Sequence, residues 1–151
     1  MDYLTPLREI QNILNELDFE SSLLSESDTG SLDMILVKFQ NNKGESQSIA
    51  VSFMPLSEEL EGSHFIQFYY EYPFAIQSPC PDGLKTLINN INRQLPLGHF
   101  NTNVAWGQIY FKYVLAVSSE HPVVTEQMGD ILDIILFALP HFENEFSNFR
   151  K

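Results

Sequence analysis

Cysteine is almost absent from this chain, because Cys80 is the single one among 151 residues. One thiol excludes a disulfide within the chain, and chains without disulfides are typical of reducing compartments. Long apolar runs are missing as well: the longest, residues 134–139, is far shorter than the roughly 20 residues that span a bilayer. The first ten residues contain no apolar run of the signal-peptide kind. The sequence therefore predicts a cytoplasmic protein without a membrane partner.

Basic residues are scarce too. Eight Lys and Arg stand against 20 Asp and Glu, which gives a net charge of −12. The bases are scattered along the sequence, whereas a nucleic-acid-binding face gathers them to neutralise phosphates. Nucleic acid is therefore a disfavoured partner. The acidity is typical of a surface kept soluble by charge, and it also favours basic or amphipathic partner segments.

Motifs that carry chemistry are missing as well. The four histidines show no HxxxH or HExxH spacing, so no helix is expected to present two metal ligands on one face. No glycine-rich phosphate-binding loop is present. No histidine stands near Cys80 in the sequence to activate the thiol. The sequence thus predicts no catalytic residue, no metal and no cofactor, and an enzyme assembled from dispersed residues is the least favoured function.

Apolar periodicity predicts one domain over residues 1–151. Helices are expected from Pro6 to Leu17 with Thr5 as the cap, over 82–95, and over 122–148 with a kink or break at Pro140. Strands are expected at residues 32–39, 48–54, 65–72 (ended by Pro73), 99–103 and 108–117, and residues 20–31 are expected to be irregular. The order α-β-β-β-α-β-β-α predicts an α+β fold, with a curved antiparallel sheet flanked by helices.

The second half of the chain resembles a known group. LINNINRQLPLGHF (87–100), GQIYFKYVLAV (107–117) and a terminal helix beginning at HPVV are similar to segments of the YbjN-like family, which has the fold of type III secretion chaperones. The distinctive positions are Asn89, Asn90, Asn92, Gly98 and Gly107. The resemblance implies that fold over nearly the whole chain and a non-enzymatic, often dimeric protein. Secretion chaperones hold an unfolded segment of another protein against apolar surfaces, whereas YbjN-like proteins are linked to regulation and stress.

Aromatic residues concentrate in FIQFYYEYPF (65–74), which holds six rings in ten positions. Strand alternation places Phe68 and Tyr70 on a core face, and Phe65 and Tyr69 on the opposite, half-exposed face. Stacking on nucleic-acid bases needs cations between the rings, but the charges that flank this run are acidic. The outer rings therefore pack within the chain, form a dimer contact or receive a segment of another protein.

A second aromatic stripe lies near the C-terminus. Phe142, Phe146 and Phe149 follow helical spacing, and a bend at Pro140 would carry them towards a second subunit or a peptide. With Phe65 and Tyr69 they form the predicted partner-binding residues.

These observations favour a non-enzymatic protein-interaction module, chaperone-like or regulatory, that binds apolar segments of a partner protein and forms a homodimer. The alternative is a small-molecule-binding sensory regulator with an apolar pocket between the sheet and the C-terminal helix.

Overall fold

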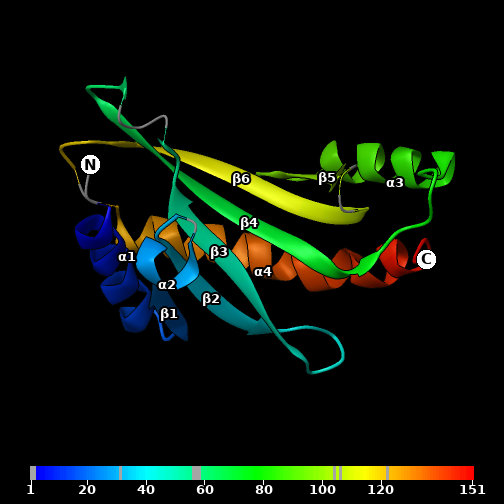
Figure 1. The fold of residues 1–151 in the computed structure, drawn as a ribbon, viewed down its shortest axis with the longest axis horizontal. Helices are drawn as coiled ribbons and strands as arrows, with labels where there is room; N and C mark the ends of the chain where they lie inside the picture. Colours follow the sequence, from blue (N-terminus) through cyan, green and yellow to red (C-terminus); the bar gives the residue numbers. More distant parts are fainter. Residues whose placement is uncertain (1–2, 31, 56–58, 104, 106, 122) are drawn as a thin grey trace.

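Six strands form one curved, open antiparallel sheet in the order β1-β2-β3-β4-β6-β5 (Figure 1). The computed structural model describes residues 3–30, 32–55, 59–103, 105, 107–121 and 123–151. The strands are β1 (Ser21–Leu24), β2 (Met34–Gln40), β3 (Ser46–Phe53), β4 (Ser63–Ala75), β5 (His99–Asn103) and β6 (Gln108–Ser118). The helices are α1 (Leu4–Glu16), α2 (Glu26–Thr29), α3 (Asp82–Asn92) and α4 (Thr125–Ser147). The predicted α+β class and antiparallel sheet are confirmed.

The pairing of β4 with β6 organises the sheet. These two strands run side by side from Ser63↔Ser118 to Ala75↔Gln108. Because side chains alternate along a strand, every second residue of β4 from Ile66 to Tyr72 points to the same face, and all four are buried. The predicted core face of the aromatic run is confirmed.

Three helices contribute to the core that this face forms. α4 lies behind the sheet along its length, and α1 packs beside β1 and β2 (Figure 1). Each helix buries one apolar stripe, as helical periodicity requires, and the single core cluster joins these stripes to the strands. The fully buried residues on the helices include Leu7, Leu14, Leu84, Leu132, Ile135 and Phe146.

A group of rings ties β4, β5 and α4 together. Phe146 lies 5.1 Å from Phe100 and 5.4 Å from Tyr72 between ring centroids, with interplanar angles of 63° and 67°. Edge-to-face contacts of this kind stabilise beyond the area they bury. The Tyr72 hydroxyl also donates a 2.7 Å hydrogen bond to the Leu139 carbonyl of α4. The ring group therefore fixes the last turns of α4 against the sheet.

Pro140 does not break α4, which is one helix from Thr125 to Ser147. A proline removes one backbone donor and usually weakens the helix locally. Here two side chains bond carbonyls at this point: Tyr72 bonds that of Leu139, and Asn42 Nδ2 donates to that of Pro140 at 2.6 Å. The expected break is wrong, since the helix continues through Pro140.

Residues 20–30 are more ordered than expected, and residue 31 lies outside the described residues. Ser21–Leu24 pairs with β2 as an edge strand, and a capping box between Ser25 and Asp28 begins the short α2. The strand is only four residues long and depends on its pairing with β2, so its own pattern is too short to reveal it.

Several predicted boundaries differ from the structure by a few residues, including the end of the second helix at Asn92. α1 begins at Leu4 with Tyr3 as its N-cap, not at Thr5, since the Leu7 N–H already bonds the Tyr3 carbonyl at 3.0 Å. β4 continues past Pro73 to Ala75. Its register with β6 shifts between Glu71 and Ala75, and a proline without a backbone donor is tolerated at such an irregularity. α4 starts at Thr125, and Pro122 lies outside the described residues.

The edge strand β5 is held by one asparagine and one glycine. Asn92 Nδ2 donates to the Phe100 carbonyl at 2.9 Å, and the Phe100 N–H donates to Asn92 Oδ1 at 2.8 Å. Gly98 has a φ of 72°, and a Cβ there would clash with the Phe111 ring. Two of the five positions that carry the family resemblance thus have a definite structural role.

Asn92→Ala should lower the free energy of unfolding by about 1–3 kcal/mol, because it leaves two backbone groups of Phe100 without their partner. Urea denaturation measures the change. Asn90→Ala is the matched control, since Asn90 is exposed on the same helix and an exposed substitution usually changes stability by less than about 0.5 kcal/mol. Equal effects of both substitutions would contradict this role of Asn92.

Tyr72 should make the fold sensitive to alkali. Burial, and secondarily the nearby Tyr70 and Glu143, raise the pKa of its hydroxyl above the ordinary value of 10.0. The contribution of Tyr72 to the free energy of unfolding is therefore fully present below pH 10. It is lost as the pH rises further, because the hydroxyl ionises in the unfolded chain before it ionises in the folded one. Denaturant titrations on either side of that pH should show this loss, and Tyr72→Phe should show less of it. An unchanged pH dependence in Tyr72→Phe would refute the assignment.

Candidate functional site

An apolar groove of about 500 Å³ lies between the segment that follows α3 and the outer side of α4. We call it the α4 groove. It is lined by Gln94, Leu95, Pro96, Asp133, Ile134, Phe137, Ala138, His141 and Phe142. The helical spacing of residues 134, 137, 138 and 141 puts them on neighbouring positions of α4, so one rigid element forms most of the groove.

Phe137 is the most exposed large apolar side chain among the described residues, with 69% of its surface accessible. Its ring stacks on His141, with centroids 5.0 Å apart and planes 19° from parallel. His141 in turn meets the edge of Phe142 at 4.7 Å. These three rings form a continuous aromatic surface along the groove, and an exposed surface of this kind is typical of a binding site.

Acidic side chains lie on the same side of α4. Glu126, Asp130 and Asp133 precede Phe137 at spacings of four, three and four residues, which puts all of them on one exposed stripe of the helix. Asp133 itself lines the groove. The site is therefore apolar with a negative margin, and it suits a ligand that has an apolar face and a basic flank.

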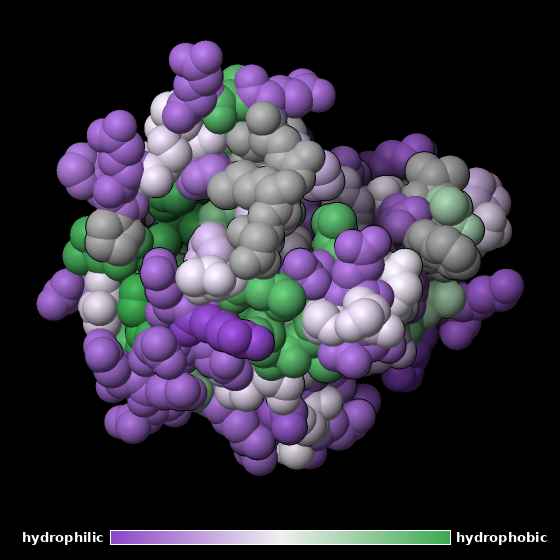
Figure 2. All heavy atoms as spheres, turned by 60° about the vertical axis from the view of Figure 1, so that its left-hand side comes forward, coloured by the Kyte–Doolittle hydropathy of each residue, from purple (hydrophilic) through white to green (hydrophobic). Residues whose placement is uncertain are grey.

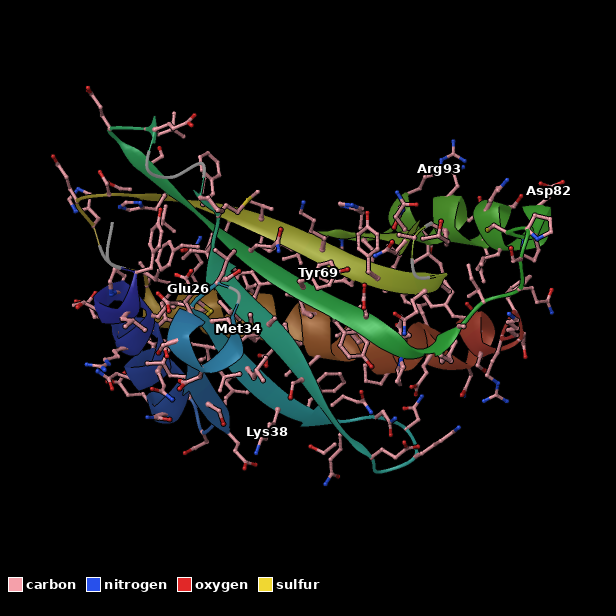
Figure 3. The ribbon with its side chains drawn as sticks, viewed as in Figure 1. Glu26, Met34, Lys38, Tyr69, Asp82 and Arg93 are labelled. Atoms are coloured by element: carbon pink, nitrogen blue, oxygen red, sulfur yellow. The ribbon has the colours of Figure 1, made fainter. Side chains whose placement is uncertain are left out.

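Phe65 and Tyr69 lie far from this groove in the fold, on the face of the sheet that points away from α4. Figure 3 shows Tyr69 midway along β4. We call this face the outer sheet face. One row of paired residues crosses it and consists of Ser22, Leu36, Ala50, Tyr69, Lys112 and His99. The predicted half-exposed position of Phe65 and Tyr69 is confirmed, since both are partly buried.

Tyr69 is held in one orientation on this face. Its ring stacks on Tyr110, with centroids 5.5 Å apart, and its hydroxyl donates a 2.7 Å hydrogen bond to Glu71 Oε1. Burial, and next the bond to Glu71, raise the pKa of Tyr69 above its ordinary value. The ring therefore stays neutral and fixed at physiological pH.

The C-terminal stripe does not act as one surface. Phe142 lines the α4 groove and is partly buried. Phe146 is completely buried in the core ring group, so no partner reaches it in this fold. Phe149 packs over Gly83 at the start of α3, where a Cβ on Gly83 would lie 3.5 Å from its ring, and its carbonyl accepts the Gln77 N–H at 2.9 Å. Of the three, only Phe142 belongs to the groove.

Phe137 was absent from the predicted site, although a signal for it exists in the sequence. Residues 134–139 are all apolar, and six consecutive helical residues cover more than the full circumference of a helix. At least one of them has to face away from the core. The exposed one is Phe137.

The core ring group occupies part of the space between the sheet and α4. A small cavity of about 120 Å³ lies between the end of β4, the β2–β3 loop and the last turns of α4, and Pro73, Glu143 and Arg150 are among its lining residues. A larger pocket of about 360 Å³ lies between α1 and the ends of β3, β4 and β6, lined among others by Glu9, Ile13, Phe53, His64 and Val117. Figure 2 shows this end of the molecule, where apolar residues lie in separate small areas between hydrophilic ones.

The described part of the chain contains no group of three or more His, Cys, Asp or Glu side chains placed to hold a metal ion. Within the same residues, no helix is both long and apolar enough to cross a membrane. Cys80 is partly buried, and its Sγ lies 3.8 Å from the Pro81 carbonyl.

Truncation of two phenylalanines of α4 should change the stability by very different amounts. Phe146→Ala should lower the free energy of unfolding by about 3–5 kcal/mol, because it leaves a cavity in the ring group. Phe137→Ala should change it by less than about 0.5 kcal/mol, because the ring is largely in water. Thermal denaturation of both variants tests this. A large loss in Phe137→Ala would show that this ring is structural.

In comparisons with known proteins, neither a protein-family model nor a curated protein matches this chain. The resemblance to the YbjN-like family stays a prediction from the sequence.

Proposed function

We propose that this chain is a non-enzymatic protein-interaction module that holds a short apolar segment of another protein in the α4 groove, in a chaperone-like or regulatory role. The observation that carries the proposal is the exposure of Phe137 beside a preformed apolar groove. An aromatic ring exposed to water is unfavourable, and a partner that covers it gains roughly 25 cal/mol per Å² of apolar surface removed from water.

The groove has the size and chemistry of a site for a few anchoring side chains. Its volume of about 500 Å³ falls within the range of about 300–1,000 Å³ that binding pockets span. An apolar groove of this kind is suited to an amphipathic partner helix, because the apolar residues of such a helix at i, i+3 and i+4 lie on one face and can enter the groove together. The acidic residues on the same stripe favour Lys and Arg at the margin of that segment.

The family resemblance agrees with this proposal, since it implies a protein that holds apolar segments of another chain. Acidity favours basic or amphipathic partners in the same way. Cytoplasmic localisation is part of the proposal and rests on cysteine usage.

Photo-crosslinking tests the proposal directly. A benzoylphenylalanine at position 137 should form adducts with a partner protein in the cells that make this chain. The same residue at position 85 is the matched control, because Lys85 is exposed on α3 and lies outside the groove. Absence of adducts at 137, or the same adducts at both positions, would refute the proposed site.

The crosslinked segment, made as a peptide, then gives the energetics. Phe137→Ala should weaken its binding by about 2 kcal/mol or more, roughly 30-fold, because truncating a central aromatic anchor has effects of this size. Fluorescence anisotropy measures the affinity. Val124→Ala is the control, since Val124 is 55% exposed at the start of the same helix and lies outside the groove. Equal losses in both variants would argue against an anchor at Phe137.

A further inference from the structure

The pocket of about 360 Å³ beside α1 lies at the end of the molecule that is opposite to α3 (Figure 1). We call it the α1 pocket. Its volume falls within the range of about 300–1,000 Å³ that ligand-binding pockets span. The apolar side chains that line it are Pro6, Ile10, Ile13, Phe53, Val117 and Val123. They come from α1, the ends of β3 and β6 and the segment before α4, so elements that the core holds in place form most of the wall.

Aromatic rings fix one part of this wall. The Phe53 ring stacks on Tyr3, with centroids 5.1 Å apart, and meets His64 edge to face at 5.8 Å. Phe53 is itself buried in the core. A wall that is already in place suits a ligand with an apolar body, because little conformational entropy is lost when the ligand binds.

The same wall contains a polar atom without a partner. His64 lines the α1 pocket, and its Nδ1 is buried and makes no hydrogen bond to any described residue. Folded proteins satisfy nearly all of their buried polar atoms, whereas cavities that stay empty are lined by apolar groups alone. An apolar pocket with a few polar groups in its wall has the composition of a small-molecule site.

The charges of the α1 pocket are negative. Glu9 of α1 and Glu120, which follows β6, are among its lining residues, and none of the described lining residues is Lys or Arg. Both glutamates are exposed, and neither makes an ion pair within 4.0 Å among the described residues. Two unpaired carboxylates attract a cation and repel an anion. The net charge of −12 on the whole chain adds to this attraction.

We infer that the α1 pocket binds a small organic amine, a molecule with one ammonium group and an aromatic or alkyl body. The body packs against Ile13, Phe53 and Val117, and the ammonium group lies where the pocket opens to solvent, close to Glu9 and Glu120. The apolar wall accepts many bodies of suitable size, whereas the two carboxylates select the charge. The inference is independent of the proposed function, because no residue lines both the α1 pocket and the α4 groove.

Isothermal titration calorimetry with three probes of similar shape tests the selection of charge on the intact chain. 2-Phenylethylamine should bind with a dissociation constant of roughly 0.1 mM, an ordinary affinity for a ligand of this size. The neutral 2-phenylethanol should bind about tenfold more weakly, and the anionic 3-phenylpropionate about 100-fold more weakly. No detectable binding of the amine, or equal affinities for the amine and the alcohol, would overturn the inference.

A double variant, Glu9→Gln with Glu120→Gln, tests the two carboxylates. It should raise the dissociation constant of 2-phenylethylamine about tenfold and leave that of 2-phenylethanol unchanged, whereas damage to the pocket would weaken both probes. Both positions are exposed, so the melting temperature should stay the same. Glu16→Gln is the matched control, since Glu16 is exposed on the same helix and lies outside the pocket. A double variant that still prefers the amine tenfold would refute the ammonium site.

A change of shape tests the location. Ile13→Phe enlarges a partly buried lining residue, so it should weaken the binding of both 2-phenylethylamine and 2-phenylethanol by about tenfold or more. Thermal denaturation without ligand shows whether this variant is folded, and the double glutamate variant decides the inference if it is not. Phe137→Ala should leave both affinities unchanged, which separates this site from the α4 groove. Wild-type affinities in folded Ile13→Phe, or a loss of affinity in Phe137→Ala, would place the ligand elsewhere and overturn the inference.

Discussion

The long ladder between β4 and β6 is the interaction on which the rest of the structure depends. It fixes which side chains of the aromatic run face the helices and which face away, because a shift by one residue would exchange the two sets. Tyr72 then reaches Phe100, Phe146 and the Leu139 carbonyl, while Tyr69 stays on the far side with Tyr110. The core and the outer sheet face are two consequences of one register.

α4 lies against one face of the sheet (Figure 1), and the charges differ between the two sides. The exposed side of α4 carries Glu126, Asp130 and Asp133, whereas the charged residues of the six strands are Lys38, Glu71 and Lys112. The two surfaces consequently differ in chemistry. The α4 groove is apolar with an acidic margin, whereas the outer sheet face carries few charges and several polar and aromatic side chains.

Most of the fold follows from local patterns in the sequence. The alternation in 65–72 and the helical stripes of α1, α3 and α4 predict the elements and their buried sides, because both periods are set by backbone geometry. β1 could not be predicted in this way, since a segment of four residues forms a strand only because it pairs with β2. The continuity of α4 through Pro140 was not expected either, because a proline in a helical pattern usually signals a break, and the packing of the helix on the sheet is not visible in the local sequence.

The candidate site is less predictable than the fold. Aromatic residues identify places where rings gather, but whether a ring ends in the core or in water depends on how the helix is rotated, which tertiary packing decides. Phe146 and Phe137 illustrate this: both are on α4, and packing buries the first and exposes the second. The sequence favours partner binding as a class of function, and only the coordinates distinguish the residues that are accessible for it.

The bond from Asn42 to the Pro140 carbonyl has a consequence for recognition. It ties α4 to the β2–β3 loop only three residues from Phe137, next to a proline whose own φ is fixed. The helical side of the α4 groove is thereby held in one position, so a segment of the proposed kind would cost the groove little conformational entropy.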